Sequence, residues 1–244
     1  VYWAKENIHE GVYSKDKLYF SIDPFVLDSL EKFDESKLSF EGEFYSSEIF
    51  PRIRQRLTVM EDFTLGLKEI TPDTGYAAYE GKGRFYDEII LDGAGLKGKG
   101  KLEYLHTTAL SDSFRFFFDS VTAVTKSFVL PGGEREGAWF PDIKATQVEY
   151  KWLTKEDKVI LKSDKNNPIV LFEGQGTFVG ELVITPQGLK GNGTITMDNV
   201  SVTSDELIFQ EKDFKATKGT FQVANRNDPS KIQYKAEEVR IDYD

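Results

Sequence analysis

Apolar residues in the C-terminal half of the chain recur in pairs, with a single residue between the two members of each pair. Both members face the same side of a strand, because strand side chains alternate between the two faces. Successive pairs are mostly seven residues apart, and they are Val200/Val202, Leu207/Phe209, Phe214/Ala216, Phe221/Val223, Ile232/Tyr234 and Val239/Ile241. The middle residues, such as Lys215 and Arg240, are polar, with Ile208 as an exception, and Val129 between the earlier pair Phe128/Leu130 as another. The pattern predicts short strands that bury one face.

The seven-residue step admits two all-β architectures. Two-residue hairpins favour Asn-Gly or Asp-Gly turns, whereas the connecting residues here are QEKD, TKGT and FDS. A β-solenoid with gentle corners fits these connections better. The predicted fold is therefore all-β, an elongated repetitive β-solenoid (β-helix-like) with one short helix. An antiparallel β-sandwich or folded-over β-sheet repeats remain alternatives.

The one helix is predicted over residues 23–33, DPFVLDSLEKF. Asp23 is a suitable N-cap, and Pro24 suits the first helical turn. The apolar residues that follow lie at helical spacing, and they are Val26, Leu27, Leu30 and Phe33. Such a helix would cover one end of the core or sit on it as an insertion.

An internal repeat organises the chain. Shifted by 93 residues, YEGKGRFYDEIILDGAGLKGKGKL (79–102) falls on FEGQGTFVGELVITPQGLKGNGTI (172–195), and the register continues through Phe116 and Phe209. Repeats of this length indicate arrayed structural units. The predicted units are 40–130 and 131–223, in one continuous domain. Residues 1–39, with the helix, would end a preceding unit, and 224–244 would start a further one.

The glycines inside the repeat invite comparison with a phosphate-binding loop. Such a loop is a single site that leads into a helix N-terminus. Here the glycines occur twice and run into apolar strand residues such as Leu102 and Ile195. Tight turns and close backbone approach, where glycine tolerates positive φ, explain them better.

Composition narrows the range of partners. The net charge of −10 argues against nucleic acid or an anionic membrane, since both require a basic face. No apolar run approaches the roughly 18–20 residues of a transmembrane helix. The chain lacks cysteine, so it has neither disulfides nor thiol chemistry. It begins at Val1 without a signal peptide, as expected of a mature protein or an excised fragment.

Candidate chemistry is sparse. His9 and His106 are the two histidines, far apart, and the carboxylates are spread along polar faces, so no catalytic residue, metal site or cofactor is predicted. One loop, LPGGEREGAWFPD (130–142), interrupts the repeat and carries Trp139. An exposed tryptophan beside hydrogen-bonding groups stacks sugar rings well. The candidate glycan site is Trp139, Glu134, Arg135 and Glu136. In the alternative interpretation, Trp139 anchors the loop onto the core.

Three segments resemble a known group of proteins, namely LSFEGEFYSSEIFPRI, GLKGKGKLEYLHTTALSDSFRFFFDS and FEGQGTFVGELVITPQGLKGNGTITMDNVSVTSD. They are similar to parts of very large, repetitive, uncharacterised cell-envelope or secreted proteins of Bacteroidota, over most of residues 38–223. The resemblance implies that the chain is a fragment of such a protein, and it carries over no activity. The alternation of short strands and glycines also resembles, in style, AsmA/TamB-type envelope bridges.

Together these features predict a non-enzymatic structural or adhesive scaffold segment of a large extracytoplasmic β-repeat protein, in the envelope, on the surface or secreted. Its partners would be other repeats of the parent chain or surface polymers. One alternative is a carbohydrate-binding or polysaccharide-processing module. A second is a lipid-bridging segment of the envelope, which would need an apolar groove open to the outside.

Overall fold

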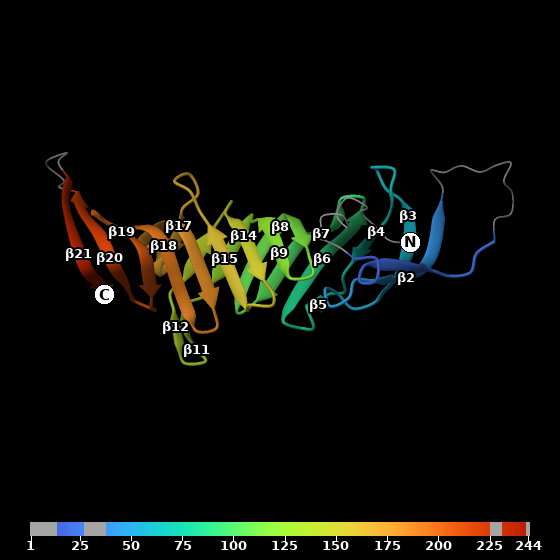
Figure 1. Ribbon diagram of the computed structural model, residues 1–244, viewed down its shortest axis with the longest axis horizontal. Coiled ribbons are helices and arrows are strands. Elements are labelled where there is room, and N and C mark those ends of the chain that lie inside the picture. Colours follow the sequence, from blue (N-terminus) through green and yellow to red (C-terminus); the bar gives the residue numbers. More distant parts are fainter. Residues whose placement is uncertain (1–13, 27–37, 225–230, 243–244) are drawn as a thin grey trace. The chain divides into compact units, whose positions relative to one another are not determined.

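The computed structural model describes residues 14–26, 38–224 and 231–242, and within them the chain is all-β (Figure 1). It divides into two compact units. The first comprises 1–102 and 113–121, and the second comprises 103–112 and 122–244. No helix among the described residues is long and apolar enough to cross a membrane.

The first unit is an antiparallel sheet in which β1 pairs with β2, β2 with β3, β3 with β4, and β4 with β6. β5 pairs with the beginning of β6. The strands are β1 (Tyr19–Ile22), β2 (Ser39–Tyr45), β3 (Ile53–Val59), β4 (Leu65–Ile70), β5 (Tyr76–Ala78) and β6 (Gly83–Asp92). Three further strands contribute residues to both units: β7 (Gly95–Tyr104), β8 (Thr107–Phe116) and β9 (Ser120–Val124).

Phenylalanines form the centre of the first unit. Phe50, Phe85, Phe114 and Phe116 are buried, and the ring of Phe116 lies 4.8 Å from that of Phe50 and 5.1 Å from that of Phe85. These edge-to-face contacts are a favoured aromatic geometry. Gly98 makes room for the rings, because a Cβ there would lie 2.6 Å from Phe85 and 2.8 Å from Phe116.

The second unit contains the remaining strands. They are β10 (Ser127–Leu130), β11 (Gly133–Arg135), β12 (Ala138–Phe140), β13 (Ile143–Ala145), β14 (Glu149–Leu153), β15 (Lys158–Lys162), β16 (Ile169–Leu171), β17 (Gly176–Thr185), β18 (Gly188–Met197), β19 (Val200–Phe209), β20 (Asp213–Ala224) and β21 (Lys231–Asp242). A 3-10 turn, η3, spans Phe172–Gly174. The strands β17–β21 pair in sequence order, from orange to red in Figure 1.

The predicted solenoid is wrong, because eight strands pair in a closed antiparallel ring of β8, β10, β13, β16, β17, β15, β14 and β9. Further strands continue outside the ring, and the sandwich alternative is not confirmed. The ring includes a long strand with two different neighbours. The first part of β17, Gly176–Phe178, pairs with β16, and its second part, Glu181–Ile184, pairs with β15.

The seven-residue step has a different origin from the one predicted. Each long strand carries two apolar pairs, and an odd step within one strand would place them on opposite faces. An irregularity in the middle of the strand returns both apolar pairs to the same face. In β19, two residues, Asp205 and Glu206, lie opposite the single residue Asn192 of β18, which is a β-bulge. In β20, Lys218 adopts a positive φ of 51° between the two pairs.

Buried serines complete the hydrogen bonding near these irregularities. Ser204 Oγ accepts a hydrogen bond from Glu206 N at 3.0 Å and donates to the carbonyl of Thr217 at 2.6 Å. Ser111, which the sequence alignment pairs with Ser204, donates to the carbonyl of Val124 at 2.6 Å. Both serines are buried. A buried polar side chain is compatible with the core here because its hydrogen-bonding capacity is used.

Two-residue connections do occur, at places other than the QEKD, TKGT and FDS segments. β7 and β8 are joined by Leu105 and His106, with φ of 49° and 60°, and β18 and β19 by Asp198 and Asn199. Left-handed backbone at both central positions is the requirement of the hairpin turn that Asn-Gly usually satisfies. At Leu105 and His106 bulkier residues meet it, so this turn cannot be found by a search for preferred residues. In the second connection a positive φ occurs at Asp198, where it is 49°. His106 is exposed in its turn.

The helix predicted over 23–33 falls largely on residues 27–33, outside the described residues. Asp23 and Pro24, its predicted start, belong to a non-helical segment that follows β1. The backbone N–H of Asp23 donates to the carbonyl of Glu41 at 2.9 Å. The start of the predicted helix is therefore hydrogen-bonded to the neighbouring strand β2 instead.

Candidate functional site

The interrupting loop of the sequence is a small hairpin made of β11 and β12. Glu134 lies directly opposite Trp139, and Arg135 opposite Ala138, with Glu136 and Gly137 at the turn. Directly opposed residues of antiparallel strands project from the same face. Glu134 and Trp139 therefore share one face of the hairpin, and Trp139 is 41% exposed.

Arg135 braces the hairpin from its other face. Its guanidinium donates to the carbonyl of Pro131 and lies 5.6 Å from the centre of the Phe140 ring. The contact with Phe140 is a cation–π interaction, in which the positive guanidinium is attracted to the negative face of the ring. Phe140 itself is buried. Arg135 thus supports the hairpin rather than presenting its charge beside Trp139.

Trp139 borders a pocket of about 260 Å³ in the second unit. The opposite wall belongs to the ends of β17 and β19 and to the start of β18, with Thr185, Gln187, Gly188 and Gln210 among its residues. A methyl group placed on Gly188 would meet no atom within 4 Å, so the space above this glycine is open. Gln187 and Gln210 are exposed, and their side-chain amides have no hydrogen-bond partner within the part of the chain described.

The floor of this pocket lies on the outer face of the sheet and consists of two apolar residues with a lysine between them. Val183, Lys190 and Ile208 are direct neighbours across β17, β18 and β19, and all three line the pocket. Lys190 forms an ion pair with Glu206, in which the lysine Nζ lies 3.8 Å from the glutamate Oε1. Ile208 is the outward apolar residue that broke the polar pattern of the sequence. Its position beneath the pocket gives that exception a physical reason.

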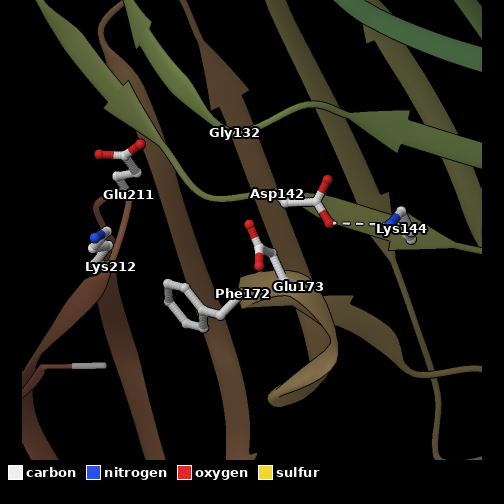
Figure 2. A pocket seen from close by; sticks show the side chains of 7 residues that line it. All are labelled: Gly132, Asp142, Lys144, Phe172, Glu173, Glu211 and Lys212. Atoms are coloured by element: carbon white, nitrogen blue, oxygen red, sulfur yellow. Dashed lines mark ion pairs between the residues drawn. The ribbon is translucent and has the colours of Figure 1, made fainter. Parts of the chain in front are cut away.

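A second, more polar pocket of about 680 Å³ lies in the same unit (Figure 2). Asp142 and Glu173 extend from one wall, and Glu211 and Lys212 from the other. Lys144 Nζ lies 3.5 Å from the Asp142 carboxylate. The pocket thus offers three carboxylates against two ammonium groups. It presents acceptors to a hydroxylated or cationic group, but the described residues contain no set of His, Asp or Glu able to hold a metal ion.

The η3 turn aims Glu173 into this polar pocket. Phe172 and Glu173 have φ of 52° and 54°, and Phe172 N donates to the Asp142 carbonyl at 3.2 Å. The first unit has a similar turn, in which Tyr79 and Glu80 have φ of 51° and 59°. There the Tyr79 hydroxyl donates to the carbonyl of Phe117 at 2.7 Å, so the buried aromatic residue anchors the turn. The glycines that close both turns have positive φ, as predicted for Gly81 and Gly174.

The structure brings together only part of the predicted glycan site. Glu134 and Trp139 share a face, Arg135 supports the hairpin from behind, and Glu136 occupies the hairpin turn with φ of 51°. Sequence reasoning missed the pocket wall formed by Thr185, Gln187 and Gln210. These residues lie 46 or more positions from Trp139 in the sequence. The signal for them was Ile208, an apolar residue at a position where the pattern predicts an outward-facing polar one.

Comparison with known proteins adds no relative: no protein-family model, no curated protein and no solved structure matches the chain.

Proposed function

We propose that the chain is a non-enzymatic scaffold segment of a larger extracytoplasmic β-repeat protein, and that it joins further repeats by strand pairing at β21. The observation that carries this proposal is the edge of the second unit. β21 pairs with β20 along its length, and no other pairing of β21 occurs among the described residues. An unpaired edge of this length is a template for another strand.

The inner face of this edge is also uncovered. Tyr234 is 56% exposed, and Val239 and Ile241 are half-buried, although all three belong to the inward apolar series. By comparison, Tyr150 and Trp152 of β14 are buried, and β15 pairs directly against them. A further strand at β21 would bury the exposed members in the same way, at about 25 cal/mol per Å² of apolar surface.

The lipid-bridging alternative has less support. It requires inward apolar residues that are open to the outside, whereas Leu161, Leu182 and Val202 are fully buried. Half-exposed inward residues occur instead on the last hairpin, where a strand would cover them. Adhesion and display remain compatible with the scaffold, because strand addition lengthens the sheet without changing its outer face.

Self-association tests the scaffold proposal, because a second copy of the chain is the simplest source of another strand. Sedimentation velocity of the intact chain should show a concentration-dependent dimer. The double variant Tyr234→Lys, Val239→Lys should stay monomeric, since charges at an edge oppose pairing. The matched control, Lys235→Gln with Glu237→Gln, changes exposed positions of the same strand and should still dimerise.

Two results would count against this role for β21. One is an intact chain that stays monomeric at every accessible concentration. The other is a dimer that forms equally well in the lysine double variant. Hydrogen exchange adds a local readout, because the backbone amides of β21 should become more protected as the concentration rises.

A further inference from the structure

The pocket beneath the β11–β12 hairpin has the features of a small ligand site, and these are independent of the β21 edge. We propose that it binds a neutral sugar unit of a polysaccharide, with Trp139 as the stacking platform and Gln187 and Gln210 as hydrogen-bonding groups. The ligand class follows from the combination of one exposed aromatic face with unpaired amides, because a pyranose has an apolar C–H face and a polar rim of hydroxyls.

The aromatic platform is held in place before any ligand arrives. Arg135 fixes the hairpin from behind through the Pro131 carbonyl and the Phe140 ring, and β12 lies against β18. Trp139 has few rotatable bonds, so little entropy is lost when a ring stacks on it. Its 41% exposure leaves a face available, while the rest of the side chain lines the pocket.

The opposite wall supplies donors and acceptors that nothing else uses. The amides of Gln187 and Gln210 are exposed and lack partners among the described residues. Gly188, the first residue of β18, leaves open space in the pocket. Each amide both donates and accepts, as a sugar hydroxyl requires. Lys190 is engaged by Glu206, so the site favours a neutral sugar over an acidic one.

The first unit shows what this surface is like without such a pocket. The residues 93 positions before Thr185, Lys190 and Ile208 are Asp92, Lys97 and Arg115. There Lys97 forms an ion pair with Asp92, and Arg115 reaches the carbonyl of Ala94 at 3.5 Å. Both units thus have a lysine here, which in the second unit is paired with Glu206, but the charged Asp92 and Arg115 of the first unit are replaced by Thr185 and Ile208 in the second.

The test uses cellohexaose, xylohexaose, mannohexaose and chitohexaose as separate probes, each titrated by isothermal calorimetry and by tryptophan fluorescence. At least one should bind the intact chain with a dissociation constant of about 1 mM or tighter. Trp139→Ala, and separately the double variant Gln187→Ala, Gln210→Ala, should weaken binding by roughly tenfold or more. The control Gln175→Ala removes an exposed amide elsewhere in the unit and should leave affinity unchanged.

Near-ultraviolet circular dichroism and melting curves establish that each variant is folded. Trp139→Phe keeps an aromatic face and should retain part of the affinity, which provides a second readout if Trp139→Ala destabilises the hairpin. Failure of all four probes to bind the intact chain would overturn the proposal. Unchanged affinity in folded Trp139→Ala or in the glutamine double variant would overturn it as well. Neither result bears on self-association at β21, so the two proposals fail separately.

Discussion

The rings of Tyr104 and Trp152 stack, with centroids 4.1 Å apart and planes 24° from parallel. Trp152 is fully buried, and the Tyr104 hydroxyl donates to the Asp157 carboxylate at 3.2 Å. The stack joins the end of β7 to β14, which are 48 positions apart in the sequence. Within the second unit it is the aromatic contact that links these two strands.

Truncation of Trp152 should therefore be among the most damaging single changes. Trp152→Ala removes a fully buried indole, and we expect a loss of roughly 3–5 kcal/mol in the free energy of unfolding. Trp152→Phe keeps a ring against Tyr104 and should lose less. Urea denaturation followed by circular dichroism measures both. Equal losses for Trp152→Phe and Trp152→Ala would mean that the stack contributes nothing of its own.

Alkaline pH should destabilise the protein through its buried tyrosines. Burial, and secondarily the charge of Asp157, raise the pKa of Tyr104, and burial raises the pKa of Tyr150 as well. Burial and the hydrogen bond to Glu69 raise the pKa of Tyr76 to about 12. Above the unfolded value of about 10, the unfolded chain loses phenol protons that the folded chain keeps. The unfolded state then binds fewer protons, so stability is complete below this pH and falls as pH rises.

Urea midpoints at a series of pH values from neutral to strongly alkaline measure this effect. Tyr104→Phe should flatten the alkaline fall, because phenylalanine has no proton to lose. A wild-type midpoint that stays constant through the titration of free tyrosine would contradict the assigned burial.

The alternation of buried and exposed residues along β8 can be tested energetically. Phe116 and its repeat equivalent Phe209 are buried, whereas Arg115 between Phe114 and Phe116 is exposed. Phe116→Ala and Phe209→Ala should each cost roughly 3–5 kcal/mol in the free energy of unfolding. Arg115→Ala should stay within about 0.5 kcal/mol, as at other surface positions. Denaturant unfolding of the three variants gives the comparison, and similar losses at Phe116 and Arg115 would refute it.

Two glycines should resist enlargement because aromatic rings occupy the space beside them. A Cβ at Gly98 would lie 2.6 Å from Phe85, and one at Gly191 would lie 3.0 Å from Phe209. Gly98→Ala should cost about 1–3 kcal/mol through overpacking, with Gly191→Ala at the lower end. Gly219 is the control, since its nearest contact would be an ordinary 3.4 Å. Thermal melts in which Gly219→Ala loses as much as Gly98→Ala would exclude the steric explanation.

The bulge in β19 should depend on Ser204. Ser204→Ala removes a buried hydroxyl and leaves the part-buried Glu206 amide without its acceptor, so we expect a loss of about 1 kcal/mol. Thr203→Ala next to it removes an exposed hydroxyl and should have a small effect. Urea unfolding distinguishes the two variants. Hydrogen exchange at Glu206 should also accelerate in Ser204→Ala, and an unchanged rate would show that the serine does not hold the bulge.

Much of the strand content could be predicted from the sequence, whereas the way the strands connect could not. Phe116, Phe209 and Phe214 are buried as the apolar pairs required. The error came from treating each pair as a separate strand. A step of seven is odd, so two pairs on one face of a single strand already imply a bulge between them. The sequence therefore already implied a bulge in β19, next to Ser204.

Turns and the pocket wall were harder to predict, for different reasons. Leu105 and His106 adopt left-handed backbone that their side chains do not favour, so the surrounding strands impose the turn. Gln187 and Gln210 are ordinary surface residues until the pairing of β17, β18 and β19 places them opposite Trp139. Trp139 itself was identified because the sequence interrupts its repeat there, and such an interruption marks a departure from the common framework.

The order of pairing in β17–β21 also has a consequence for how the protein folds. Every strand in this run pairs with its immediate successor, and the connections between successive strands are short. Contacts between close sequence neighbours form quickly because little chain entropy is lost in closing each loop. The ring closes instead through pairs such as β8 with β10 and β15 with β17, which span longer segments. We therefore expect the C-terminal run to assemble hairpin by hairpin, and closure of the ring, which needs longer loops, to be the slower step.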